Sequence, residues 1–166
     1  MFDERRKRLL FLVLMVVVFF QTGAHASQAF VNYPAWKYIS AESFPTYHRV
    51  MTTGAALLAL SRVIELVLAI AALRYRPTVI KPWMLVLAIA LSLCALLSTV
   101  LIQRPIHRQL DIVGNAPELL GRLQDTNWLR LVPEWIRAGL YFWMMSLLLR
   151  SPFHEGPTSE NRGRSV

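Results

Sequence analysis

The sequence predicts an all-α protein, a transmembrane four-helix bundle with a short interfacial helix in the third connection. Three observations lead to this prediction. Hydrophobic residues make up 55% of the 166 residues and charged residues only 17%, against about 45–50% and 25% in soluble domains. The apolar residues form four long runs. The 18 Lys and Arg exceed the 10 Asp and Glu and gather beside alternate ends of these runs, as cytoplasmic loops require.

The four expected spans cover about residues 9–33, 50–73, 82–103 and 129–149. A helix needs about 20 mostly apolar residues to cross a bilayer core that is roughly 30 Å thick. The third run is the cleanest because residues 82–103 carry no formal charge. The spans form one domain over residues 1–150. The polar residues 151–166 are expected to be a disordered cytoplasmic tail.

The first apolar run has two interpretations, a membrane span and a signal peptide. Basic residues 5–8, the apolar residues 9–20 and Ala24-His25-Ala26 fit a signal sequence that is cleaved before Ser27. No charge follows until Lys37, however, so the helix can continue to a full span. We expect the first helix to be retained, with cleavage as the alternative.

The third connection begins at Arg104 and is the longest. Pro117 suits the first turn of a helix, and Leu119, Leu120 and Leu123 follow at helical spacing. This pattern predicts a short amphipathic helix that lies on the outer interface before the fourth span.

The positions of Lys and Arg predict the orientation. Ten of them lie on one side if the chain crosses four times: Arg5, Arg6, Lys7, Arg8, Arg74, Arg76, Lys81, Arg150, Arg162 and Arg164. The other side has five, partly offset by acidic residues. We therefore expect a multi-pass protein of the cell (inner) membrane with both termini cytoplasmic. The excess of Lys and Arg over Asp and Glu is then explained by contact with the lipid bilayer, and nucleic acid is excluded as a partner.

Polar residues within the first span lie on one helical face: Gln21, His25, Gln28 and Asn32. Such a stripe should face the interior of the bundle. It either forms hydrogen bonds between helices or lines a ligand pocket, in which case His25 and Asn32 are candidate ligand-binding residues.

Charged residues also lie within the second and fourth spans, where each costs about 2.5–3.5 kcal/mol unless it is paired. Arg62 and Glu65 are three residues apart and can pair along the second helix. The fourth helix carries a continuous polar face of Asn127, Arg130, Glu134 and Arg137. Glu134 can pair with either arginine of its own helix, and Glu65 is a natural counter-ion for Arg137. The network either specifies helix order or builds a pocket for an anionic or polar head group, with Glu65, Glu134 and Arg137 as candidate ligand-binding residues.

His48 and His107 are expected at the non-cytoplasmic boundary, where Glu42, Asp111 and Asp125 could join them. No HExxH, CxxCH, GxSxG or GxGxxG motif occurs, so the sequence identifies no cofactor and no metal ligands. The single cysteine, Cys94, cannot form an internal disulfide.

Three short segments carry a family resemblance. They are Phe44-Pro45-Thr46-Tyr47-His48-Arg49, Arg104-Pro105-Ile106-His107-Arg108-Gln109-Leu110 and Thr126-Asn127-Trp128-Leu129-Arg130. In this order they resemble small bacterial four-helix membrane proteins of unknown function, distantly related to the anthrone-oxygenase-like family. The resemblance implies four spans and an uncleaved first helix. It places the following residues on positions that the family displays: Tyr47, His48, Glu65, Pro105, His107, Asn127, Trp128, Arg130 and Arg137. Trp128 thereby becomes a candidate ligand-binding residue.

These observations predict an integral membrane protein of unassigned biochemical role, with a polar His/Asn/Arg pocket near its non-cytoplasmic face. One alternative is a membrane oxidoreductase for a lipophilic aromatic or quinone-like substrate. His48 or His107 would be its general base, and Asn127 and Arg130 would hold an oxyanion. Another is a protein that binds a lipophilic or anionic small ligand. The third is an assembly subunit, in a homo-oligomer or with a membrane-complex partner.

Overall fold

The computed structural model describes residues 3–151, which are helical apart from short connections. They form four long helical segments. The first segment is continuous and consists of α1 (Glu4–Ser27), the π-helix η1 (Gln28–Asn32) and α2 (Tyr33–Trp36). The second is α3 (Phe44–Arg74). The third is again continuous and consists of α4 (Pro82–Ser98), the π-helix η2 (Thr99–Gln103) and α5 (Arg104–Val113), and the fourth is α6 (Pro117–Arg150).

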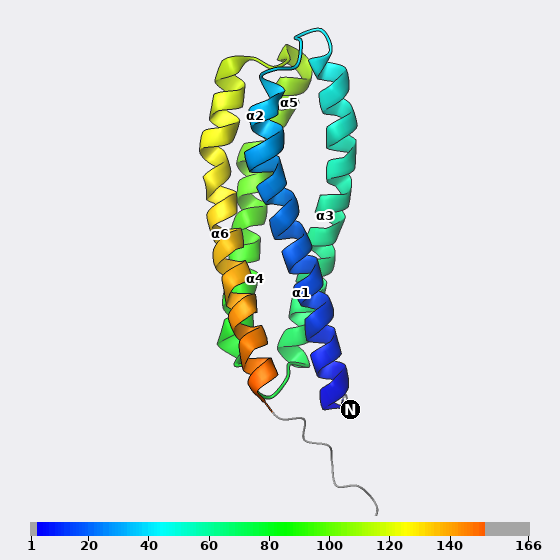
Figure 1. The fold of residues 1–166 in the computed structure, drawn as a ribbon, viewed down its shortest axis with the longest axis vertical. Helices are drawn as coiled ribbons and strands as arrows, with labels where there is room; N and C mark the ends of the chain where they lie inside the picture. Colours follow the sequence, from blue (N-terminus) through cyan, green and yellow to red (C-terminus); the bar gives the residue numbers. More distant parts are fainter. Residues whose placement is uncertain (1–2, 152–166) are drawn as a thin grey trace, which may run out of the picture.

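The four segments pack side by side as an elongated bundle (Figure 1). The start of α1, the connection between α3 and α4, and the end of α6 lie together at one end, which we call the basic end (residues 3–8, 74–81 and 150–151). There the Arg8 Nη2 atom donates to Ser151 Oγ over 2.8 Å, which ties α1 to the end of α6. We call the opposite end the histidine end (residues 33–48 and 104–118).

The two connections at the histidine end are tied to each other. The Asn115 side-chain amide donates to the Ile39 carbonyl over 2.7 Å and to the Trp36 carbonyl over 3.4 Å. Gly114 ends α5 with φ +85°, a conformation that favours glycine. The turn from α5 to α6 is therefore fixed against the turn that follows α2.

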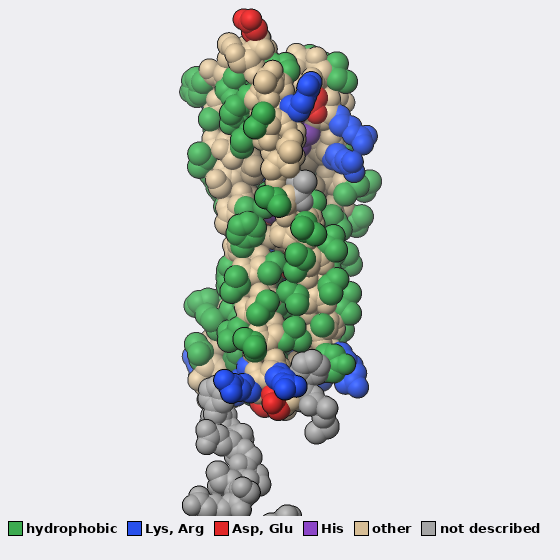
Figure 2. Space-filling view, turned by 90° about the vertical axis from the view of Figure 1, so that its right-hand side faces the viewer, with side chains coloured by type: hydrophobic (Ala, Val, Ile, Leu, Met, Phe, Trp, Pro, Cys, Tyr) green, Lys and Arg blue, Asp and Glu red, His purple; other side chains and the backbone are tan. Residues whose placement is uncertain are grey.

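The surface along the bundle is apolar and its interior is partly polar. Exposed fractions are 70% for Val16, 61% for Val67 and 68% for Leu101, whereas Glu134 and Arg137 are fully buried. Figure 2 shows hydrophobic side chains along one face, with Lys and Arg confined towards its two ends. Three described helical segments, residues 4–36, 44–74 and 82–113, are long and apolar enough to cross a membrane. This arrangement is that of a membrane protein.

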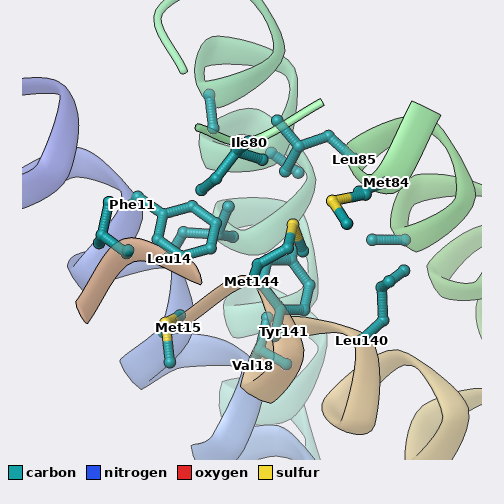
Figure 3. Packing of buried hydrophobic residues seen from close by; sticks show 14 residues of the cluster. Phe11, Leu14, Met15, Val18, Ile80, Met84, Leu85, Leu140, Tyr141 and Met144 are labelled. Carbon is teal, nitrogen blue, oxygen red and sulfur yellow. The ribbon is translucent and has the colours of Figure 1, made fainter. Parts of the chain in front are cut away.

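Buried apolar side chains form one cluster at each end of the bundle. The larger cluster fills the basic-end half and includes Phe11 and Leu14 of α1, Leu85 of α4, and Tyr141 and Met144 of α6, which Figure 3 shows packed together. The smaller one lies at the histidine end around Tyr33, Trp36, Phe44, Ile106, Leu110 and Leu123. The middle of the bundle is left to polar side chains.

The two π-helices have a common local cause. In η1 the N–H of Tyr33 bonds to the carbonyl of Gln28, five residues back, and Pro34 follows. In η2 the N–H of Arg104 bonds to the carbonyl of Thr99, and Pro105 follows. Proline lacks an N–H and clashes with the carbonyl four residues before it. The wider π-turn accommodates the ring, so both helices continue past their prolines instead of ending.

The helices are longer than the predicted spans, and one predicted element is wrong. The expected separate interfacial helix after Pro117 is the beginning of α6, which runs unbroken into the predicted fourth span. Pro117 starts a helix as expected, but nothing after it stops that helix. The short helix that does lie in the third connection is α5, which continues α4. The predicted tail falls on residues 152–166, outside the described residues.

Candidate functional site

A network of charged side chains lies in the middle of the bundle, between the two apolar clusters. Arg62 of α3 donates to Glu65 Oε2 over 2.8 Å and also pairs with Glu134 of α6. Arg137 Nη1 lies 2.6 Å from Glu65 Oε1 and 2.7 Å from Oε2. His25 Nδ1 of α1 lies 2.7 Å from Glu134 Oε2. Two arginines therefore meet two carboxylates.

Ser92 of α4 completes this network. Its Oγ accepts hydrogen bonds from Arg62 Nη1 over 3.0 Å and from Arg137 Nη1 over 3.1 Å. Each of the four long helical segments thus contributes a side chain, which fixes their depth relative to one another. We call the set of Arg62, Glu65, Ser92, Glu134, Arg137 and His25 the charge network.

Two of the pairings expected from the sequence are confirmed and one is wrong. Arg62 pairs with Glu65 along α3, and Glu65 is the counter-ion of Arg137 across the bundle. Glu134 pairs with Arg62 and His25 from the neighbouring helices. It does not pair with the arginines of its own helix, because α3 brings the Arg62 guanidinium within closer reach of its carboxylate.

A second set of polar side chains forms a hydrogen-bonded chain at the histidine end. Asp111 Oδ1 lies 2.6 Å from His48 Nδ1, and His48 Nε2 lies 2.9 Å from His107 Nδ1. His107 Nε2 lies 3.3 Å from Tyr33 Oη, which accepts from Arg130 Nη2 over 3.4 Å. We call Tyr33, His107, His48 and Asp111 the histidine chain.

The direction of each hydrogen bond in this chain follows from its ends. Asp111 can only accept as a carboxylate, so His48 carries its proton on Nδ1. Neutral His48 then accepts at Nε2, which makes His107 the donor at Nδ1. His107 in turn accepts at Nε2 from the Tyr33 hydroxyl. With both imidazoles neutral, the pattern of partners gives one set of directions, in which every donor points towards Asp111.

A cavity of about 520 Å³ lies between the charge network and the histidine end. This volume falls within the roughly 300–1,000 Å³ of typical small-molecule sites. Its apolar wall includes Leu58 and Ala59 of α3 and Leu96 and Val100 of α4 and η2. Ala59 and Val100 are also exposed, so the cavity reaches the outer surface between these two segments.

The polar wall of the cavity is cationic. It includes four arginines, Arg62, Arg104, Arg108 and Arg130, and one carboxylate, that of Asp111. Arg62 is neutralised within the charge network. Arg130 is 5% exposed, bonds to Asn127 Oδ1 over 2.6 Å and has a buried Nε without a partner. Within residues 3–151 no carboxylate lies within ion-pair distance of it.

The structure brings most of the predicted site residues to this region. His25, His107 and Arg130 line the cavity. His48 and Asn127 lie directly behind them, through their bonds to His107 and Arg130. Glu65, Glu134 and Arg137 are buried in the charge network, away from the cavity wall.

Two predicted site residues lie elsewhere. Trp128 is 48% exposed and packs against Phe30 and Trp135 on the outer surface. Asn32 is partly buried, bonds to Gln28 and does not line the cavity. The π-turn shifts the helical register by one residue, so Tyr33 occupies the inward position that regular spacing assigned to Asn32.

Tyr33, Arg62 and Gln103 also line the cavity, although they are not among the site residues predicted from the sequence. The signal for Arg62 was its charge at membrane depth. Tyr33 directly precedes Pro34 and Gln103 lies two residues before Pro105, so a proline near the end of an apolar run was the available signal. Among residues 3–151, no group of three or more His, Cys, Asp or Glu side chains is arranged to hold a metal ion.

The charge network generates a stability prediction. Glu65→Gln removes the carboxylate that Arg137 contacts and leaves a buried cation, so we expect a loss of about 3–5 kcal/mol. Glu118→Gln, at an exposed position of α6, should change stability by less than about 0.5 kcal/mol. Denaturant unfolding in detergent measures both. The double variant Glu65→Gln/Arg137→Gln should lose less than the sum of its single changes. Equal effects at Glu65 and Glu118 would contradict the prediction.

Comparison of the chain with protein-family models, curated proteins and solved structures finds no match. The resemblance to anthrone-oxygenase-like proteins therefore stays a prediction from the three short segments that suggested it. The observations that bear on function are the cavity, the histidine chain, and Arg130, which has no carboxylate partner within the described part of the chain.

Proposed function

We propose that this protein crosses the cell membrane four times, with both termini in the cytoplasm, and binds an amphiphilic molecule with an anionic group in its outward-facing half. The observation that carries the proposal is Arg130, a buried arginine that has no carboxylate partner among residues 3–151 and lies beside a cavity of about 520 Å³.

The fourth crossing is the part of this topology that hydropathy alone does not support, because Arg130, Glu134 and Arg137 make α6 more polar than the other segments. All three are buried inside the bundle. The opposite side of α6 is apolar, with Ile136 54%, Phe142 61% and Leu149 77% exposed. A bilayer would therefore meet an apolar surface on α6 as well.

The orientation follows from the basic end. Residues 5–8, Arg74, Arg76, Lys81 and Arg150 lie there in the fold, and an excess of Lys and Arg marks the cytoplasmic side. Trp83 and Trp143 pack together near this end, as expected of aromatic residues at an interface. The cavity and the histidine end then lie towards the non-cytoplasmic side.

The cavity fits an anionic amphiphile at both of its walls. An apolar chain can lie against Leu58, Ala59, Leu96 and Val100. An anionic group beside Arg130 gives that guanidinium its missing counter-charge, and a charge-assisted bond to arginine is among the stronger polar contacts. Because the cavity reaches the surface between α3 and η2, the ligand can enter from the bilayer.

A second candidate function is proton-transfer catalysis on a lipophilic aromatic or quinone-like substrate. One observation favours it: His107 Nε2 and Arg130 Nη2 contact the same phenolic oxygen, that of Tyr33. A base and a cation thus converge on one oxygen at the cavity wall. This is the arrangement that removes a proton from a substrate and stabilises the anion that forms.

The topology predicts the sidedness of labelling. In a Cys94→Ser background, Ser40→Cys at the histidine end should react in intact cells with a membrane-impermeant thiol reagent. Thr78→Cys at the basic end should react only after the cells are opened, because we place that end in the cytoplasm. Both positions are exposed in the fold. Labelling of Thr78→Cys in intact cells would contradict the orientation.

The ligand proposal predicts selective binding of anions. In lipid nanodiscs, decanesulfonate should bind the full chain, and decyltrimethylammonium, with the same chain length, should not. Arg130→Gln should weaken decanesulfonate binding by at least about tenfold, which corresponds to about 1.4 kcal/mol. Arg122→Gln, on an exposed turn of the same helix, is the control. Calorimetry measures the affinities, and equal binding of anion and cation would overturn the proposal.

The catalytic candidate predicts proton exchange. The full chain should accelerate deuterium incorporation at the acidic C–H of a lipophilic ketone such as 2-tetralone, followed by NMR. His107→Asn should reduce this acceleration by about a hundredfold, since it removes the base. Trp128→Phe, on the outer surface, should leave it unchanged. Exchange no faster than in empty nanodiscs would remove this candidate.

A further inference from the structure

We propose that the histidine chain is a proton path between the ligand cavity and the water at the histidine end, an inference that rests on the ligand site proposed above. The path starts at Tyr33 and His107 on the cavity wall, passes through His48 and ends at Asp111. It would let an acidic amphiphile enter the cavity in its neutral form and lose its proton there.

The burial of its members gives the path an inner and an outer end. The His48 side chain is fully buried, and the Asp111 side chain is 40% exposed. Tyr33 is 3% exposed and lines the cavity together with His107. Asp111 also lines the cavity, at a more exposed position. A proton at the buried Tyr33 reaches this position, and the water beside it, through His107 and His48.

The geometry of the two imidazoles suits transfer between them. Their ring planes are 22° from parallel, with centroids 5.2 Å apart, and their facing nitrogens are 2.9 Å apart. Trp36 and Phe44 hold His48 in place through edge and stacking contacts at centroid distances of 5.0 and 5.4 Å. Short, aligned contacts of this kind are what proton transfer between side chains needs.

The transfer balances without any oxidant or reductant. The acid O–H bond of the ligand breaks and its proton goes to Tyr33 Oη, whose own proton passes to His107 Nε2. The proton on His107 Nδ1 passes to His48 Nε2, and that on His48 Nδ1 passes to Asp111, which releases it to water. The ligand remains as an anion beside Arg130, and the reverse sequence reprotonates it.

The charges that face the chain favour this direction. Arg130 of α6 faces Tyr33 and His107, and Arg104 and Arg108 of α5 lie on the same cavity wall. His25 of α1 lies across the cavity and bonds to Glu134, so it belongs to the charge network and not to the proton path. Asp111 is the one carboxylate in the cavity wall as described. The cations retain the ligand anion, and the single carboxylate receives the proton.

The experiment, at about pH 5, compares decanoic acid, a fraction of which still carries its carboxyl proton at that pH, with decanesulfonate, which carries none. The full chain in nanodiscs is mixed with each probe in a stopped-flow instrument, and a pH indicator in the water reports proton release, with empty nanodiscs subtracted. Decanoic acid should produce rapid proton release and decanesulfonate none. Asp111→Asn and Tyr33→Phe, which preserve the shape of the side chains, should each slow the release by about tenfold or more.

The controls separate the proton path from the ligand site. Asp125→Asn, at an exposed position of α6 outside the chain, should release protons at the wild-type rate. Decanesulfonate should still bind Asp111→Asn, since the sulfonate is held by Arg130 and loses no cationic partner in this variant. Wild-type proton release in both path variants, with sulfonate binding intact, overturns the proton path and leaves the ligand site standing. Failure of both probes to bind the wild-type chain overturns the ligand site and, with it, the path.

A second measurement tests the chain without any ligand. Nitrogen-15 NMR of labelled histidines should show His48 and His107 both protonated at Nδ1, as the hydrogen-bond directions require. Asp111→Asn should alter the His48 signals more than those of His25. Protonation of either imidazole at Nε2 alone would contradict the path.

Discussion

Two arginines and two glutamates are buried together in the middle of this bundle, and the arrangement of the helices depends on their mutual neutralisation. A lone ion at this depth of a bilayer costs about 2.5–3.5 kcal/mol. Arg62 and Glu65 of α3 have to lie opposite Glu134 and Arg137 of α6, with Ser92 of α4 and His25 of α1 beside them. Between apolar helices that slide and rotate easily, this requirement selects one depth and one rotation for each helix.

The same constraint creates the cavity. The charge network fills the section of the bundle above the larger apolar cluster, and the smaller cluster closes the histidine end. The section between them holds Arg130 with Asn127 and Tyr33 as its only polar partners among the described residues. Because the two arginines and two carboxylates below it balance one another, Arg130 keeps a buried positive charge that no carboxylate of residues 3–151 offsets. An anionic ligand would neutralise it.

Charge and helical spacing in the sequence predicted the helical class, the buried face of α6 and the pairing of Arg62 and Arg137 with Glu65. Spacing failed where the backbone departs from an α-helix. Asn32 was assigned to the interior by regular spacing, but η1 inserts an extra residue and turns Tyr33 inward instead. The chain from Asp111 to Tyr33 joins residues far apart in sequence, and only tertiary packing reveals it. Trp128 was selected by resemblance alone and lies on the outer surface.

The two π-turns show how local sequence serves the site. Pro34 and Pro105 would each disturb a regular helix, because a proline ring clashes with the carbonyl four residues before it. The π-turns preserve both helices, and their extra residues turn Tyr33 and His107 towards the cavity. Gln103 at the end of η2 donates to the Thr126 carbonyl over 3.1 Å and so holds η2 against α6 beside Asn127. The prolines thus position both the inner end of the histidine chain and the wall that carries Arg130.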